Sequence, residues 1–324
     1  MRLLTLGLLL MALALAYKPP VIMARGQDGL LVVTSFPNLA CDLELLALEG
    51  DEVIPLVPPG VDPHDYQLTP SDVEVLRKAD IIISTAHTPF EMEIKDLWAR
   101  GELKGALVEV PRVPGVELLR NPMTGQINYH MPTYDPGNLM AFVSYLADLM
   151  ASLRPDRAGD YASKASAVIE AINSILSGAP KLSCVAVADL PFAQYAVNWL
   201  GVEVRFLVVK EHGVPATPGD LMRIEEAMSS GEVELAVVCA PTTPSPSRRL
   251  EELAEEHGIP ILHVPSPSSP ESTLSKLARI AEEAAGLSPP GEQASGTWDV
   301  GLALALASSI MVLVALAPVL ARRR

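Results

Sequence analysis

The sequence lacks the motifs that mark the common classes of enzyme and nucleic-acid-binding protein. No phosphate-binding loop, dinucleotide fingerprint or nucleophile motif occurs in it. Its three cysteines, Cys41, Cys184 and Cys239, show no CxxC spacing, and their odd number leaves at least one thiol outside any disulfide. Basic residues are outnumbered by acidic ones, so the formal net charge is −15. This charge makes nucleic acid an unfavourable partner and a cation a favourable one.

Charge is missing altogether from a stretch near each end of the chain. The uncharged run at residues 3–16 has the length of the apolar region of a secretory signal, so we predict a signal peptide over residues 1–26. An uncleaved membrane anchor is the alternative, and no cysteine follows the run as a lipid-attachment site would require. We predict a linker over residues 286–298 and a transmembrane anchor over residues 299–321. The three terminal arginines would stay in the cytoplasm and leave the rest outside, anchored to the cell membrane.

The sequence between these ends repeats one order of predicted elements. Short β-branched runs alternate with helical patterns, which predicts an α/β fold with parallel sheets. We expect two pseudo-symmetric lobes, over residues 28–134 and 179–285, joined by linking helices at residues 135–178. The predicted strands are residues 31–35, 53–57, 80–84 and 106–110 in the first lobe and residues 184–188, 202–208, 235–239 and 260–264 in the second.

The second linking helix carries an apolar face over its whole length. Apolar residues recur at intervals of three and four from Tyr161 to Leu176. A helix over residues 155–177 would be about 34 Å long at 1.5 Å per residue. We therefore expect a backbone helix that runs along both lobes and restricts hinge opening.

A proline-rich loop at residues 58–72 presents a single histidine, His64, and then begins a helix predicted over residues 70–78. The helix start, Thr69-Pro70-Ser71-Asp72, is repeated in the second lobe as Thr217-Pro218-Gly219-Asp220. His64 and His212 each precede the threonine of their helix start by five residues. Both would lie at the carboxyl ends of parallel strands, where α/β sheets bind ligands. The repeat therefore predicts a cleft with one histidine on each wall.

The loop also carries a family resemblance. The segment Leu56-Val57-Pro58-Pro59-Gly60-Val61-Asp62-Pro63-His64-Asp65-Tyr66 resembles the zinc- and manganese-specific substrate-binding proteins of ABC importers, which are metal receptors with a single backbone helix. The resemblance extends over residues 30–285. His130, which precedes the helix start Asp135-Pro136, resembles the second ligand segment of that family. The resemblance implies two ligands, His64 and His130, from the first lobe.

The second lobe departs from the family pattern. Asp189 stands where the family has its third ligand, and Val264 stands where it has an acidic residue before a proline. His212 and Asp189 are the natural substitutes, and only His212 is also supported by the internal repeat. We therefore predict a metal site formed by His64 and His130 from the first lobe and by His212 or Asp189 from the second, with Asp62 or Asp65 as the partner that orients His64.

The other three histidines are weaker candidates. His87 follows the third predicted strand and is either a ligand or a residue that lines the cleft. His263 ends the last strand, near the lost acidic position. His257 lies at the carboxyl end of a predicted helix, where the helix dipole favours it as a structural residue.

The resemblance and the charge together predict an extracytoplasmic receptor rather than an enzyme. It would bind Zn²⁺ or Mn²⁺ between the lobes as a transported ligand and deliver the ion to an ABC permease. One alternative is a receptor of the same fold for another solute, such as a metal chelate. The other is a surface metallohydrolase, with Glu211 as the base.

Overall fold

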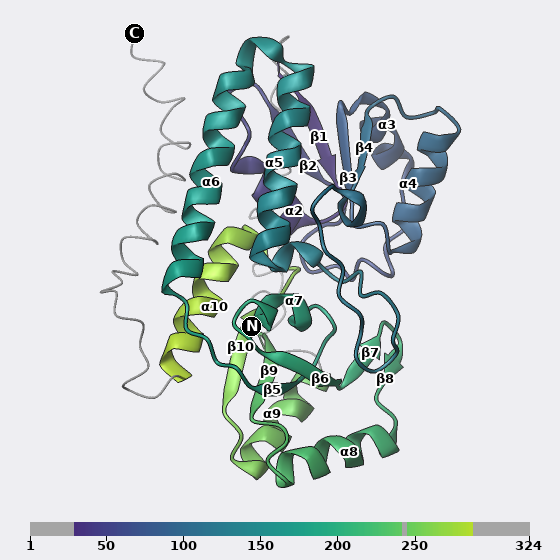
Figure 1. Ribbon diagram of the computed structural model, residues 1–324. Coiled ribbons are helices and arrows are strands. Elements are labelled where there is room, and N and C mark those ends of the chain that lie inside the picture. Colours follow the sequence, from purple (N-terminus) through teal and green to yellow (C-terminus); the bar gives the residue numbers. More distant parts are fainter. Residues whose placement is uncertain (1–28, 242–244, 288–324) are drawn as a thin grey trace, which may run out of the picture.

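The computed structural model describes residues 29–241 and 245–287, which form two α/β lobes (Figure 1). The predicted signal peptide at residues 1–26 and transmembrane anchor at residues 299–321 lie outside the described residues, as does the predicted linker beyond residue 287. Among the helices of the described part, none has the length and apolar character needed to cross a membrane.

The first lobe is built on a parallel sheet in the order β2-β1-β3-β4. The two central strands are buried at every position, which explains their continuous apolar sequence, because helices cover both faces of such sheets. The strands are β1 (Leu31–Thr34), β2 (Glu52–Pro55), β3 (Ile81–Ser84) and β4 (Ala106–Glu109). The helices are α2 (Pro37–Glu44), α3 (Pro70–Lys78) and α4 (Pro89–Ala99).

The second lobe repeats this topology. Its parallel sheet has the order β10-β9-β5-β6, so the first two strands of each lobe pair with each other and the third and fourth follow on the other side. The strands are β5 (Val185–Ala188), β6 (Glu203–Leu207), β9 (Leu235–Ala240) and β10 (Ile261–Pro265). The helices are α7 (Ala193–Asn198), α8 (Pro218–Ser229), α9 (Ser245–His257) and α10 (Thr273–Leu287). The prediction of two α/β lobes with parallel sheets is confirmed.

One element of the second lobe was not predicted. After β6 the chain forms a short hairpin of β7 (Val209–Glu211) and β8 (Val214–Pro215). Gly213 lies in its turn with a φ of 70°, a conformation that glycine adopts without strain. His212 is therefore on the tip of a hairpin, whereas His64 is on an irregular loop.

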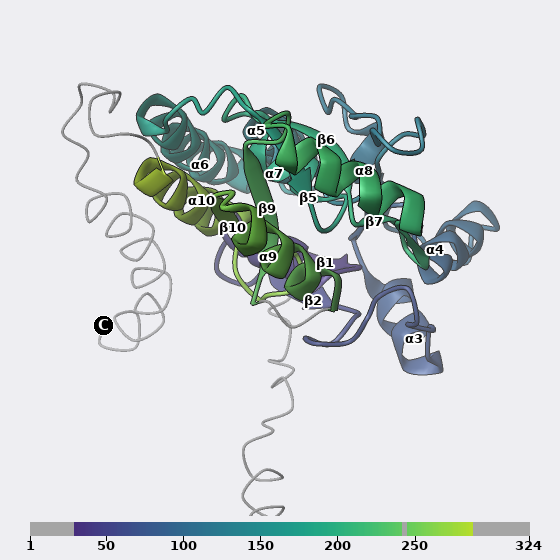
Figure 2. The ribbon, with the colours of Figure 1, turned by 90° about the horizontal axis from the view of Figure 1, so that it is seen from below.

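Two long helices connect the lobes, α5 (Pro136–Leu153) and α6 (Ala158–Gly178). The residues Pro155–Arg157 between them form a short 3₁₀ helix, so the helix predicted over residues 155–177 begins as an α-helix only at Ala158. α6 buries Tyr161, Ala165, Val168, Ile172 and Ile175, which is the apolar face expected from the sequence. α10 returns beside α6 (Figure 2). It also contacts α2 of the first lobe.

Buried polar contacts hold the lobes together. Asp42 of α2 accepts hydrogen bonds from the backbone N and the Oγ1 of Thr273 at the start of α10, at 2.5 and 2.7 Å. Tyr134 donates its hydroxyl hydrogen to the carbonyl of Pro265 at the end of β10. Around them a single cluster of buried apolar residues extends through both lobes. The two lobes are thus packed on one shared core.

Candidate metal centre

His64 lies on the loop between β2 and α3, where an aspartate turns the backbone. The Asp62 Oδ1 atom accepts a hydrogen bond from the His64 backbone N at 2.9 Å. The loop then ends in a capping box, in which the Thr69 side chain and the Asp72 carboxylate bond each other's backbone N–H groups. His64 is thereby presented, half-buried, at the carboxyl end of the first sheet.

His87 lies in the same lobe, on the loop between β3 and α4. Ala86, just before it, has a φ of 59°, a left-handed conformation that is uncommon for any residue but glycine. The His87 Nδ1 lies 2.7 Å from Thr85 Oγ1, and that hydroxyl also lies within hydrogen-bond distance of the Glu91 carboxylate. Because the one hydroxyl hydrogen goes to the carboxylate, the ring donates through Nδ1. The Nε2 lone pair of His87 is then free to bind a metal.

His130 is oriented by an asparagine. Asn128 Oδ1 accepts hydrogen bonds from both the backbone N and the Nδ1 of His130, each at 3.0 Å. The Asn128 amide nitrogen donates in turn to the carbonyl of Pro191 and to Gln194, which fixes the oxygen toward the histidine. Nδ1 therefore carries the proton, and the Nε2 lone pair faces the site, 3.7 Å from Glu211 Oε2.

The segment that carries His130 is bound to the second lobe, although it precedes that lobe by many residues in the chain. We call residues 119–130 the strap. Tyr195 of α7 accepts a hydrogen bond from the Leu119 backbone N and donates one to the Asn128 carbonyl. Asn121 donates to the carbonyl of Lys210 in β7. The second lobe therefore positions His130 relative to the histidines of the first lobe.

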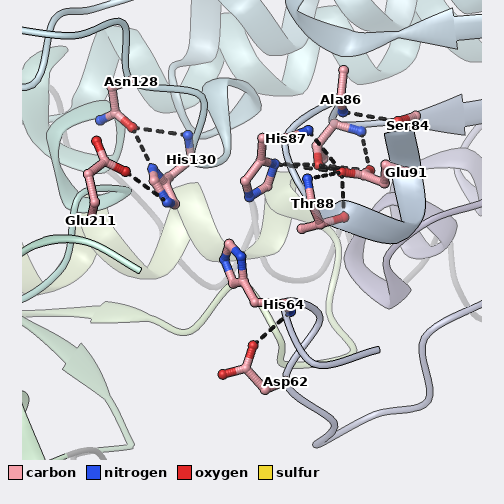
Figure 3. Close-up of polar contacts among 11 residues, drawn as sticks. Asp62, His64, Ser84, Ala86, His87, Thr88, Glu91, Asn128, His130 and Glu211 are labelled. Carbon is pink, nitrogen blue, oxygen red and sulfur yellow. Dashed lines mark hydrogen bonds and ion pairs between the residues drawn. The ribbon is translucent and has the colours of Figure 1, made fainter. Parts of the chain in front are cut away.

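Three histidines converge in the site, and we call His64, His87 and His130 the inner trio (Figure 3). The ring centroids lie 5.3 Å apart for His64 and His87, 5.2 Å for His87 and His130, and 6.2 Å for His64 and His130. One nitrogen from each ring lies within 4.8 Å of the others. To hold a metal with Zn–N bonds of about 2.0–2.1 Å, these nitrogens would draw together around the ion.

His212 reaches the same site from the second lobe. Its ring stacks on that of His64, with centroids 4.0 Å apart and planes 11° apart. Asp62, His64 and His212 form a second group whose ligand atoms lie within 4.8 Å of one another, and we call it the outer trio. The structure therefore brings His64, His130 and His212 together, with His64 shared between the two trios.

The electrostatics of the site keep the rings neutral, as metal ligation requires. Burial, with the neighbouring rings of His212 and His87, lowers the pKa of His64. Burial also lowers the pKa of His87, against the opposing effect of Glu91. For His130, burial and the three neighbouring histidines lower the pKa to about 3. The histidines of the inner trio therefore hold their lone pairs ready for a cation at neutral pH.

Asp189 is not brought into either trio. Its side chain is fully buried at the end of β5, where Oδ2 accepts hydrogen bonds from the Cys239 backbone N at 2.7 Å and from Ser247 Oγ at 2.6 Å. The carboxylate thus binds its own sheet and α9.

The remaining candidates, Asp65, His257 and His263, belong to neither trio. Of the two predicted partners of His64, Asp62 bonds its backbone, and neither trio includes Asp65. His263 is ion-paired through Nδ1 with Glu283 and through Nε2 with Glu251. His257 ends α9, as its sequence context predicted.

Comparisons with known proteins indicate the family and the fold. Residues 32–281 match the family described as "Zinc-uptake complex component A periplasmic" (ZnuA). A curated relative is the manganese-binding lipoprotein MntA of Halalkalibacterium halodurans, 27% identical over 153 residues. The matched part covers 47% of this chain and 49% of that protein, so the chain spans about half the length of this relative.

Solved structures share the fold over nearly their whole length. The SBP FpvC of Pseudomonas aeruginosa, solved in complex with Ni²⁺, has a TM-score of 0.63 at 18% identity, and the alignment covers 81% of this chain and 99% of that one. A Cd-bound periplasmic metal-binding protein of Candidatus Liberibacter asiaticus has a TM-score of 0.59 at 17% identity, over 79% of this chain and 99% of that one. At these identities the structures establish the fold.

Proposed function

Because the chain belongs to the family of periplasmic zinc-uptake component A, we propose that it captures Zn²⁺ or Mn²⁺ outside the cytoplasm and delivers the ion to an ABC permease. The family resemblance inferred from the His64 loop is thereby confirmed, and the chain is a metal-binding receptor. The ion, the permease and the membrane anchor at residues 299–321 belong to the proposal. Membership of a solute-receptor family also speaks against the metallohydrolase alternative.

The observation that carries the proposal is the convergence of the inner trio. Three neutral imidazoles, two of them held in a defined tautomer by Thr85 and Asn128, match the ligand set of a transition-metal site. The inner trio itself contains no carboxylate, and imidazole nitrogen suits Zn²⁺ better than Mn²⁺, which prefers oxygen ligands. We therefore infer that Zn²⁺ is the preferred ion.

The ligand set of the proposal is His64, His87 and His130, with a fourth position open to water or to a group from the second lobe. From that lobe Glu211 faces His130, and His212 on the same hairpin stacks on His64. Asp189 has no such support, because its hydrogen bonds turn it toward Cys239 and Ser247.

Native mass spectrometry of the metal-stripped protein, titrated with Zn²⁺ and Mn²⁺, tests this function. We expect one tightly bound ion in the wild type, and loss of that ion in His64→Ala, His87→Ala and His130→Ala. His257→Ala is the matched control, because it removes a histidine from the end of α9 and should leave binding intact. A wild type that binds neither ion would refute the metal-receptor function and favour the chelate alternative.

A further inference from the structure

The outer trio has the composition of a second metal position. Asp62 offers a carboxylate oxygen, and His64 and His212 each offer a ring nitrogen, all within 4.8 Å of one another. Its residues come from both lobes, on the His64 loop and on the tip of the β7-β8 hairpin. These are donor types that bind a divalent transition metal while water fills the remaining positions.

The two trios cannot be complete at the same time. They share His64, and a neutral imidazole has a single lone pair, because its other nitrogen carries a proton. A metal held by the outer trio therefore takes the His64 ligand away from the inner trio, and the reverse also holds. One ion could therefore occupy either position in turn, and the stacked rings of His64 and His212 would have to rotate for both to bind it in the outer position.

The outer position is more exposed to solvent than the inner one. Asp62 and His212 are exposed, whereas the side chains of His87 and His130 are only 12% and 17% exposed. The outer trio also brings the carboxylate of Asp62, whereas the inner trio consists of neutral rings. An arriving cation therefore meets the ligands with a negative charge before it meets the ligands that are sheltered from water.

From these observations we infer that the outer trio is a loading position for the metal. The ion binds first to Asp62, His64 and His212 and keeps part of its water shell. It then moves to the inner trio by exchanging Asp62, His212 and water for His87 and His130, while His64 stays bound. This inference rests on the proposed metal-receptor function and adds the order in which the ligands engage.

Stopped-flow absorbance with Co²⁺ as the probe separates the two positions. Co²⁺ in a low-coordinate, nitrogen-rich site absorbs visible light more strongly than hydrated Co²⁺ does. In the wild type we expect a weak rise, whose rate increases with Co²⁺ concentration, followed by a stronger rise at a concentration-independent rate. His130→Ala should keep the first phase and lose the second.

Two variants of the outer trio test the loading step. Asp62→Asn keeps an oxygen that can accept the His64 backbone hydrogen bond and removes the charge. We expect its association rate constant to fall about tenfold at low salt, with the final spectrum unchanged. His212→Ala should slow association in the same way. Asp65→Asn is the matched control, because Asp65 is an exposed aspartate of the same loop and belongs to neither trio.

The outcomes distinguish failure of the loading step from failure of the function. If His212→Ala reduces the final absorbance as much as His130→Ala does, His212 is a ligand of the final site and the two-position inference is wrong. If Asp62→Asn and His212→Ala associate as fast as Asp65→Asn, the outer trio has no loading role, although the receptor function stands. A wild type that binds neither Co²⁺ nor Zn²⁺ overturns both.

Discussion

The two lobes share a strand order and a helix-capping motif, yet each buries a carboxylate near its strand ends for a different purpose. In the first lobe this residue is Glu91, at the start of α4, and in the second it is Asp189, after β5. Both side chains are almost inaccessible to water. The two carboxylates differ in the number of hydrogen bonds that they accept, and therefore in their pKa and in the part of the structure that they support.

Glu91 is surrounded by donors. Its two oxygens accept hydrogen bonds from the backbone N–H groups of Thr85, His87 and Thr88 and from the hydroxyls of Thr85 and Thr88. Burial alone would raise the pKa of Glu91, but His87 and these donors more than offset it, so that the pKa lies below its usual range. A carboxylate that is charged at neutral pH therefore organises the turn that presents His87.

Asp189 has fewer partners. Among the residues that the structure describes, Oδ2 accepts two hydrogen bonds and Oδ1 has no hydrogen-bond partner. Burial therefore dominates and raises the pKa of Asp189 to about 6. The lobes thus reuse one scaffold, but the buried acid of the first supports the turn of His87 in the proposed metal site, whereas that of the second binds its own sheet and α9.

The largest expected contrast between the lobes is in metal affinity. His130→Ala should weaken Zn²⁺ binding by at least about 100-fold, because loss of a mere orienting partner of a ligand already costs about 10–100-fold. Asp189→Asn should change the affinity by less than about twofold, because Asp189 belongs to neither trio. Competition titration against a Zn²⁺ chelator measures both. A large loss in Asp189→Asn would restore this residue as a ligand and break the comparison.

Glu91→Gln should be the most damaging change to stability. The amide nitrogen of glutamine would face donors that now share a carboxylate, so we expect a loss of about 3 kcal/mol in the free energy of unfolding. Zn²⁺ affinity should fall by about tenfold as well, because His87 loses its support. Urea denaturation and the chelator competition measure the two effects. An unchanged stability would mean that Glu91 is not held as a charged group.

The pH dependence of stability should differ between the wild type and Asp189→Asn. The pKa of Asp189 is raised from 3.8 to about 6 on folding, so its contribution to stability is full below pH 4 and is lost as the pH rises through 6. Relative to the variant, the wild type should lose up to about 3 kcal/mol over this range. The pKa of Asp42 is also raised to about 6, but this shift is common to both proteins and cancels in the comparison.

Denaturation of the metal-free proteins at a series of pH values checks this prediction. We expect the difference in unfolding free energy between the two proteins to change between pH 4 and pH 6 and to be constant outside that range. A difference that is flat throughout would show that Asp189 keeps its ordinary pKa in the folded protein.

The smallest expected effects on stability concern the capping box that the two lobes share. Thr69→Ala and Thr217→Ala each remove the side chain of a capping box, at the start of α3 and of α8. Each should cost about 1 kcal/mol of unfolding free energy, measured by urea denaturation. Conversion of the same threonines to serine keeps the cap and serves as the control. A much larger loss in one lobe would show that its helix start supports more than the helix itself.

The fold could be predicted because its signals are local. Buried strands such as β3 are continuous apolar runs, and the helix starts at Thr69 and Thr217 are explicit capping sequences. The hairpin β7-β8 was missed, because its strands are only three and two residues long and only half-buried or exposed.

The site was predictable in part. The positions of His64 and His212 relative to the helix starts already indicated that they face each other, and the His130 segment carried a family signature. His87 was only a weak candidate, although it follows a strand end just as His64 does. The signal for it was the pattern Thr-Pro-Phe-Glu at residues 88–91, whose glutamate folds back over the turn. The structure does not bring Asp189 to the histidines, and sequence position could not reveal that this buried carboxylate bonds Cys239 and Ser247.

The strap has a consequence for how the protein can be divided. All residues of the inner trio precede α5 in the chain, so a fragment or a chimera that keeps only the first half would contain every one of them. Its third histidine would nevertheless lose Tyr195 and the contacts of Asn128 with Pro191 and Gln194, which hold it in place from the second half. The halves are therefore not interchangeable modules, and a lobe exchanged between relatives must bring its own matching strap.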